Sequence, residues 1–171
     1  MKKLMITALM LIGIGISASA QNWGVGFNLS YCNAVAEPSF GIKALYDINE
    51  SYTIAPSLNF YLPTTETFYK SEIKDKYWDI NVDVHYNFYN TDKGKLYPLA
   101  GITFFHINST ETFIEDNKEE SSESEGLFGI NLGFGGQMNL TDRWIVSAEI
   151  KYQIIEEEKM FIPALSLIYK F

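Results

Sequence analysis

The sequence predicts an all-β protein, an eight-stranded antiparallel up-and-down transmembrane β-barrel preceded by a cleaved signal peptide. Three observations predict this fold class. Apolar and polar residues alternate with a period of two through most of the chain, the alternating segments are about ten to twelve residues long, and the chain begins with a basic, then apolar, then small-residue segment. Successive side chains of a strand point to opposite faces, so this alternation is typical of sheets with one apolar and one polar face.

Length and composition limit the class of protein further. A chain of 171 residues suits one domain, and its 47% hydrophobic and 15% aromatic content excludes a disordered protein. The net charge of -8 argues against nucleic acid as a partner, because phosphate binding needs a basic surface. A single cysteine excludes an internal disulfide and a zinc site built on several thiolates.

The first segment of the chain has the pattern of a secretory signal peptide. Two lysines near the start are followed by the apolar run 4–16 and by the small residues Ala18-Ser19-Ala20. The apolar run is too short for a helix that spans a bilayer, and the small residues suit signal peptidase. We therefore expect a signal peptide over residues 1–20 and an exported barrel domain over residues 21–171.

Eight alternating segments follow in the exported part of the chain. In chain order, the expected strands are 23–34, 39–48, 52–62, 77–88, 96–107, 126–139, 143–154 and 160–171. The alternation is strictest in 77–88 (YWDINVDVHYNF) and in 143–154 (RWIVSAEIKYQI), where only Ile145 breaks the polar face. Segment 96–107 is apolar on both faces, which leaves its orientation open. Pro56 lies within a strand and lacks an N–H, which predicts a local bulge.

The apolar face is expected to meet lipid rather than a soluble core. Strands of this length, tilted by about 45°, rise roughly 25 Å, which is the height of an outer-membrane apolar band. Aromatic residues gather near both ends of the strands, and glycines lie on the polar face, where a narrow lumen needs room. The two long connections, 63–76 and 108–125, fall on the same side. We expect both of them outside the cell and both chain termini in the periplasm.

The end of the chain carries a family resemblance. Residues 165–171 (LSLIYKF) finish on Phe171 after apolar residues at alternate positions. This ending resembles the signal that the barrel-insertion machinery reads. With it, the mature chain resembles the small outer-membrane barrels of the OmpX and OmpA transmembrane-domain types, and the porin-like "outer membrane protein beta-barrel domain" family of Bacteroidota. The resemblance implies the outer membrane of a Gram-negative cell envelope, with outer-membrane lipid, lipopolysaccharide and the insertion machinery as partners.

Charged residues on the polar face form the candidate site. The predicted structural network of the lumen comprises Lys43, Asp47, Asp79, Asp83, His85, Arg143, Glu149 and Lys151. An unpaired charge in a narrow lumen costs several kcal/mol, so acidic and basic side chains should pair. Heights along the strands predict the pairs Lys43 with Glu149, Lys151 with Asp79, and Arg143 with Asp47. We expect a filled lumen, no catalytic, cofactor or metal site, and a structural or surface-interaction role through the external loops, whose partner the sequence does not name.

Two alternatives stay open. His106, Ser109 and Glu111 would be the base, nucleophile and acidic group of an enzyme that processes lipid A acyl chains. A conduit for small molecules is disfavoured, because eight strands enclose a space that side chains fill.

The acidic stretch 108–125 carries carboxylates that suit divalent cations but lacks the spacing of a calcium loop, so a solvated loop is favoured. Cys32 is expected to be a small residue facing the lumen.

Overall fold

The computed structural model describes residues 22–68, 71–113, 120–156 and 158–171. The expected signal peptide lies outside these residues and stays a prediction. In this part of the chain, no helix is both long and apolar enough to cross a membrane.

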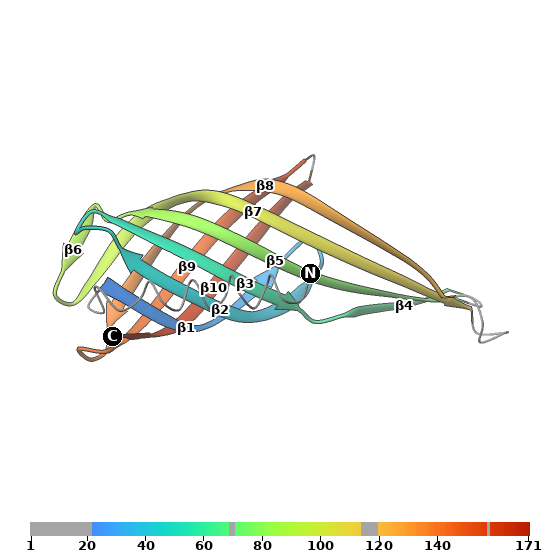
Figure 1. Ribbon diagram of the computed structural model, residues 1–171, viewed down its shortest axis with the longest axis horizontal. Helices are drawn as coiled ribbons and strands as arrows, with labels where there is room; N and C mark the ends of the chain where they lie inside the picture. The colour runs from blue at the N-terminus through green and yellow to red at the C-terminus, as the bar shows by residue number, and fades with distance from the viewer. Residues whose placement is uncertain (1–21, 69–70, 114–119, 157) are drawn as a thin grey trace, which may run out of the picture.

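The described residues form one antiparallel sheet of ten strands (Figure 1). The strands are β1 (Trp23–Cys32), β2 (Glu37–Asp47), β3 (Tyr52–Tyr61), β4 (Thr64–Phe68), β5 (Ser71–Tyr86), β6 (Tyr89–Thr91), β7 (Gly94–Phe113), β8 (Glu120–Asn139), β9 (Trp144–Ile155) and β10 (Glu158–Lys170). The short strand β4 pairs only with β5, and the short strand β6 pairs only with β7. The other eight close the barrel wall, because β1 pairs with β10 and β5 pairs with β7. The predicted fold class is confirmed.

The apolar face of the wall points outward, as predicted for a barrel in lipid. The exposed fraction is 75% for Phe27 and 74% for Phe128, whereas Asn81 and His85 are fully buried inside. This is the reverse of a soluble protein and is typical of transmembrane barrels. The structure also settles the open orientation of 96–107, because Tyr97 faces the lumen and its neighbours in sequence face outward.

The strand at Pro56 differs from the prediction. No residue is inserted in β3, since the pairs Lys43 with Ser57 and Tyr46 with Ile54 keep one register. The pairing of β3 with β5 also runs through Pro56 without a break. The predicted bulge is therefore wrong. The missing N–H is accommodated by a short gap in the pairing with β2.

The two long connections were predicted as loops, and this is wrong for their described residues. β4 and the start of β5 occupy most of 63–76, while β7 continues to Phe113 and β8 begins at Glu120. Residues 69–70 and 114–119 lie outside the described part. Outside a bilayer both faces of a strand meet water, so apolar alternation disappears while the backbone still pairs.

These longer strands form a second feature, which we call the protruding sheet. It comprises β4 and residues 71–77, 107–113 and 120–126, which extend beyond the rest of the wall at the right-hand end of Figure 1. β6 and the C-terminus lie at the opposite end. Following the predicted topology, we name these the outer end and the periplasmic end.

A lysine on the lipid-facing surface should destabilise the barrel. Ile150 and Val82 both face outward, so Ile150→Lys or Val82→Lys is expected to lower the free energy of unfolding by about 2–4 kcal/mol. Urea titration of the barrel folded in lipid vesicles measures this. The matched control Ser122→Lys lies in the protruding sheet and should change little. A harmless lysine at Ile150 and Val82 would contradict the assignment of the faces.

Candidate functional site

Three buried side chains, Lys43, Tyr97 and His85, surround Glu149 inside the barrel. The Lys43 ammonium on β2 donates to Glu149 Oε1 on β9, which is the pairing that the heights along the strands predict. The Tyr97 hydroxyl donates to the same oxygen at 2.8 Å, and His85 Nε2 lies 3.7 Å away. The imidazole of His85 stacks on the ring of Tyr97, with centroids 4.1 Å apart and planes 5° apart. All four are buried, so the carboxylate is compensated by neighbours rather than by water.

A second cluster forms around Asp83. Lys151 Nζ lies 3.3 Å from Asp83 Oδ2, and Asn131 Nδ2 donates to Oδ1 at 2.7 Å. A Cβ at Gly101, opposite on β7, would clash with Asp83 Oδ1 and with the carbonyl of Val82. The glycine therefore makes room for this ion pair.

Asp79 is held by neutral donors rather than by a lysine. The Tyr61 hydroxyl donates to it at 2.5 Å, Asn59 Nδ2 at 2.7 Å and Asn81 Nδ2 at 2.5 Å. The predicted pairing of Lys151 with Asp79 is therefore wrong. Matching residues by their distance along each strand ignores the stagger that strand tilt imposes on a closed barrel.

The predicted pairing of Arg143 with Asp47 is also wrong. Asp47 lies at the periplasmic end, 3.0 Å from Lys95 Nζ and 3.6 Å from Lys170 Nζ. Arg143 is exposed and donates to the Tyr169 hydroxyl at 2.9 Å. Sequence reasoning missed Lys95 because it lay in a predicted connection. Lys95 is two residues from Tyr97 and therefore lies on the same, inward face of β7, and this spacing is the signal in the sequence.

A ladder of amides joins these clusters, and sequence reasoning gave it no role. Asn131 and Gln153 both donate to Asn81 Oδ1, at 3.0 and 2.7 Å. Asn28 donates to Asn59 Oδ1 at 2.8 Å. The signal in the sequence is the recurrence of asparagine at polar positions of the alternating segments, which predicts hydrogen-bonded amides in the lumen.

Apolar clusters flank the polar network. The outer cluster consists of Cys32, Tyr61, Phe105, Ile155, Met160 and Ile162. A smaller cluster of Leu45, Ala55, Ile145 and Ile168 lies nearer the periplasmic end. Cys32 is fully buried in the outer cluster.

The candidate enzyme residues are not brought together. His106 and Ser109 belong to the same strand and are an odd number of residues apart, so they face opposite sides of the sheet. The His106 ring packs on Trp78, with centroids 4.9 Å apart. Ser109 and Glu111 lie on the other face, across from Asp75 and Ile73 of β5. Among the described residues, no group of three or more His, Cys, Asp or Glu side chains is arranged to hold a metal ion.

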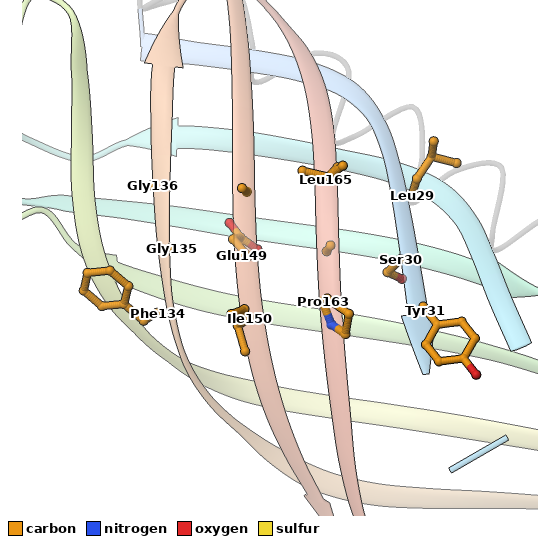
Figure 2. A pocket seen from close by; sticks show the side chains of 12 residues that line it. Leu29, Ser30, Tyr31, Phe134, Gly135, Gly136, Glu149, Ile150, Pro163 and Leu165 are labelled. Carbon is orange, nitrogen blue, oxygen red and sulfur yellow. The ribbon is translucent and has the colours of Figure 1, made fainter. Parts of the chain in front are cut away.

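The outward surface of the wall carries a shallow groove of about 570 Å³ across β1, β10, β9 and β8 (Figure 2). Leu29, Leu165, Ile150 and Phe134 lie along it. These side chains belong to the lipid-facing surface, as their exposure shows. The groove is therefore a feature of the bilayer contact.

The comparisons with known proteins agree with this geometry. The family model described as "Outer membrane protein beta-barrel domain" matches residues 6–166. The chain belongs to this family. It is therefore a transmembrane β-barrel of the bacterial outer membrane, and the resemblance seen in the sequence is confirmed. No curated protein sequence matches the chain.

Several solved structures share the fold of this family member. The attachment invasion locus protein Ail of Yersinia pestis is 17% identical, with 87% of this chain and 96% of that chain covered and a TM-score of 0.60. A major outer membrane protein from Thermus thermophilus is 10% identical, covers 87% and 98%, and has a TM-score of 0.66. Neisserial surface protein A is 16% identical, covers 88% and 97%, and has a TM-score of 0.60. At these identities the similarity shows the fold alone.

The ion pair of Lys43 and Glu149 should behave as a coupled unit. Glu149→Gln leaves the Lys43 ammonium buried without its counter-charge and should lower the free energy of unfolding by about 3–5 kcal/mol. The double variant Lys43→Met/Glu149→Gln should lose less than the sum of the single variants. Urea titration in lipid vesicles measures each. Arg143 and Asp47, which do not contact each other, are the control, and Arg143→Met and Asp47→Asn should add within about 0.5 kcal/mol. Additive losses at Lys43 and Glu149 would contradict the coupling.

Proposed function

We propose that this protein is a non-enzymatic outer-membrane barrel with a filled lumen, which holds its protruding sheet at the cell surface for interaction with an external partner. The observation that carries the proposal is the difference in strand length between the two sides of the barrel. The wall ends in short turns on the β1–β2 and β9–β10 sides, whereas β5, β7 and β8 continue well beyond it (Figure 1).

The contents of the lumen support the first half of the proposal. An eight-stranded barrel is just wide enough for side chains to fill its interior. Here those side chains are ion pairs and amides hydrogen-bonded to one another, with the outer apolar cluster above them. Opening a path through them would expose buried charges without partners, which costs several kcal/mol.

The protruding sheet supports the second half. A sheet held outside the bilayer contributes nothing to the span, yet β7 and β8 each run for 20 residues. Connections that carry function are commonly displayed on a rigid scaffold in this way. The Yersinia pestis protein with the same fold is named for attachment and invasion. Attachment at the cell surface is the class of role that we propose here.

The other proposed partners are recognised by the outward apolar face and by the C-terminal residue. The outward apolar face is proposed to contact outer-membrane lipid and lipopolysaccharide, and Phe171 is proposed to be read by the barrel-insertion machinery. An acyl-processing enzyme is disfavoured, because His106 and Ser109 face opposite sides of β7.

A filled lumen should pass little steady current in planar-bilayer recordings. Phe105→Ala with Met160→Ala removes bulk from the outer cluster and is expected to raise the frequency of brief openings. Phe27→Ala with Phe128→Ala makes similar truncations on the lipid-facing surface and should leave the current unchanged. A large, stable conductance of the unmodified barrel would mean that the lumen is an open conduit.

The protruding sheet should be accessible from outside the cell. The one native cysteine is buried, so an introduced cysteine reports its own position. Ser122→Cys in the protruding sheet should react with a membrane-impermeant maleimide on intact cells. Asn90→Cys in β6 should react only after the outer membrane is permeabilised. The reverse result would place the protruding sheet in the periplasm and end the proposal.

A further inference from the structure

The periplasmic end of the barrel contains a polar cavity, which we call the periplasmic hollow. It has a volume of about 430 Å³, and the residues that line it include Asp47, Lys95, Gln137 and Lys170. They come from β2, β7, β8 and β10, at the end that carries β6 and the C-terminus in Figure 1. Ile145 also lines the hollow and belongs to the smaller apolar cluster inside the barrel. One side of the hollow is therefore continuous with the packed interior.

Hydrogen bonds between neighbouring turns hold the rim of the hollow. Asn90 Nδ2 donates to the carbonyl of Glu50 at 3.0 Å and so joins β6 to the turn between β2 and β3. Asn139 Nδ2 donates to the carbonyl of Asp92 at 2.8 Å, and the backbone N–H of Asn139 donates to the carbonyl of Lys93 at 2.9 Å. Because these contacts already fix the rim, a ligand that enters has little ordering of the protein to offset.

Inside the hollow, two lysines share one carboxylate. Asp47 Oδ1 lies 3.0 Å from Lys95 Nζ, and Asp47 Oδ2 lies 3.6 Å from Lys170 Nζ. These three groups carry a net charge of one positive unit. The side chain of Lys95 is only 12% exposed, so water and salt screen this excess less than they would at an open surface. A further carboxylate placed here would balance it.

The rim of the hollow carries the opposite charge. The carboxylates of Glu50, Asp92 and Asp142 line the same hollow from three different turns, and all three residues are exposed. Among the described residues that line the hollow, Lys95 and Lys170 are the only cations. The charges are thus divided, with the positive excess beside Asp47 inside and negative groups around the rim.

This division of charge selects a ligand that carries both signs. A ligand with a carboxylate alone would balance the lysines but would meet the negative rim. A ligand with an ammonium alone would reach only exposed carboxylates, which water and salt screen, and would leave the lysine excess uncompensated. A carboxylate at one end and an ammonium at the other meet both needs through charge-assisted hydrogen bonds. An extended residue spans about 3.5 Å, and the hollow has room for two residues.

We propose that the periplasmic hollow binds a short zwitterionic peptide. The C-terminal carboxylate of the peptide lies against Lys95 and Lys170. Its ammonium group lies among the carboxylates of Glu50, Asp92 and Asp142. The inference goes beyond the proposed function, because that function concerns the protruding sheet at the opposite end of the barrel. By the predicted topology, the peptide reaches the hollow from the periplasm.

The test uses the full barrel in a neutral detergent, with L-alanyl-L-alanine as the probe. Two matched probes each lack one charge, because N-acetyl-L-alanyl-L-alanine has no ammonium and L-alanyl-L-alanine amide has no carboxylate. Nuclear magnetic resonance titration of the isotope-labelled barrel gives each dissociation constant and identifies the backbone amides that respond. We expect the unmodified dipeptide to bind at least about 10-fold more tightly than either matched probe, since each of these loses one charge-assisted contact. The amides of the periplasmic hollow should respond.

Three results of this comparison would overturn the proposal. Equal binding of the amide probe would mean that the hollow is a site for cations. Equal binding of the acetylated probe would mean that it is a site for carboxylates. A response confined to the amides of the protruding sheet would place the binding at the other end of the barrel.

Two lysine variants locate the carboxylate of the peptide. Lys95→Met removes the positive excess and leaves Lys170 beside Asp47 as a balanced pair, so it should weaken binding of the dipeptide by about 10-fold or more. Lys76→Met removes an exposed lysine of β5 in the protruding sheet and should leave binding unchanged. Circular dichroism checks that both variants are folded. Equal effects of the two variants in folded barrels would overturn the site.

A rim variant locates the ammonium group of the peptide. Asp142→Asn should weaken binding of the dipeptide by about 2-fold to 5-fold, because exposed ion pairs contribute less than buried ones. It should not weaken binding of the acetylated probe, which has no ammonium. Equal weakening of both probes would overturn the assigned orientation. Absence of dipeptide binding at about 10 mM would defeat the whole inference, while the proposed function, which is tested by labelling on intact cells, would stand.

Discussion

The lipid bilayer offers no hydrogen-bond partner, so every backbone N–H and C=O at its depth must be paired within the protein. A sheet meets this condition only when it has no free edge in the bilayer. In this chain the condition is met by the pairing of the first strand with the last, from Gly24 with Lys170 to Ser30 with Ala164. The order of the other strands, the outward apolar face and the narrow lumen all depend on that closure.

Closure also determines what the interior must contain. Because alternate side chains face lipid, nearly every polar group of the wall is directed into a space of fixed width, where a charge without a partner is costly. The wall accommodates the resulting pairs by giving up side chains elsewhere. A Cβ at Gly135 would lie 2.7 Å from Glu149 Cγ and 2.8 Å from Tyr97 Cε2. The glycines of β8 and β7 are thus part of the same arrangement as the ion pairs that they face.

The sequence therefore predicts some features well and others poorly, for physical reasons. The faces of β5 and β9 follow from alternation alone, because lipid imposes an apolar residue at every second position. The partners of Lys151 and Asp47 do not, because they depend on the stagger between strands that are not neighbours in the sheet. The sequence predicts loops in place of the protruding sheet, since Thr110, Thr112, Ser122 and Ser124 pair without any apolar pattern to mark them.

The same constraint explains where a free edge is tolerated. As far down as Gly129, β8 needs β9 as its second neighbour, because an unpaired backbone there would face hydrocarbon. Farther toward the outer end, the exposed serines, glutamates and glycine of residues 121–126 suit contact with water, which satisfies the backbone groups, so a second neighbour becomes optional there. Polar and charged side chains at this edge suit a position in water. One continuous strand is thus divided into a part whose pairing on both sides belongs to the closed barrel wall and a part that pairs with β7 alone.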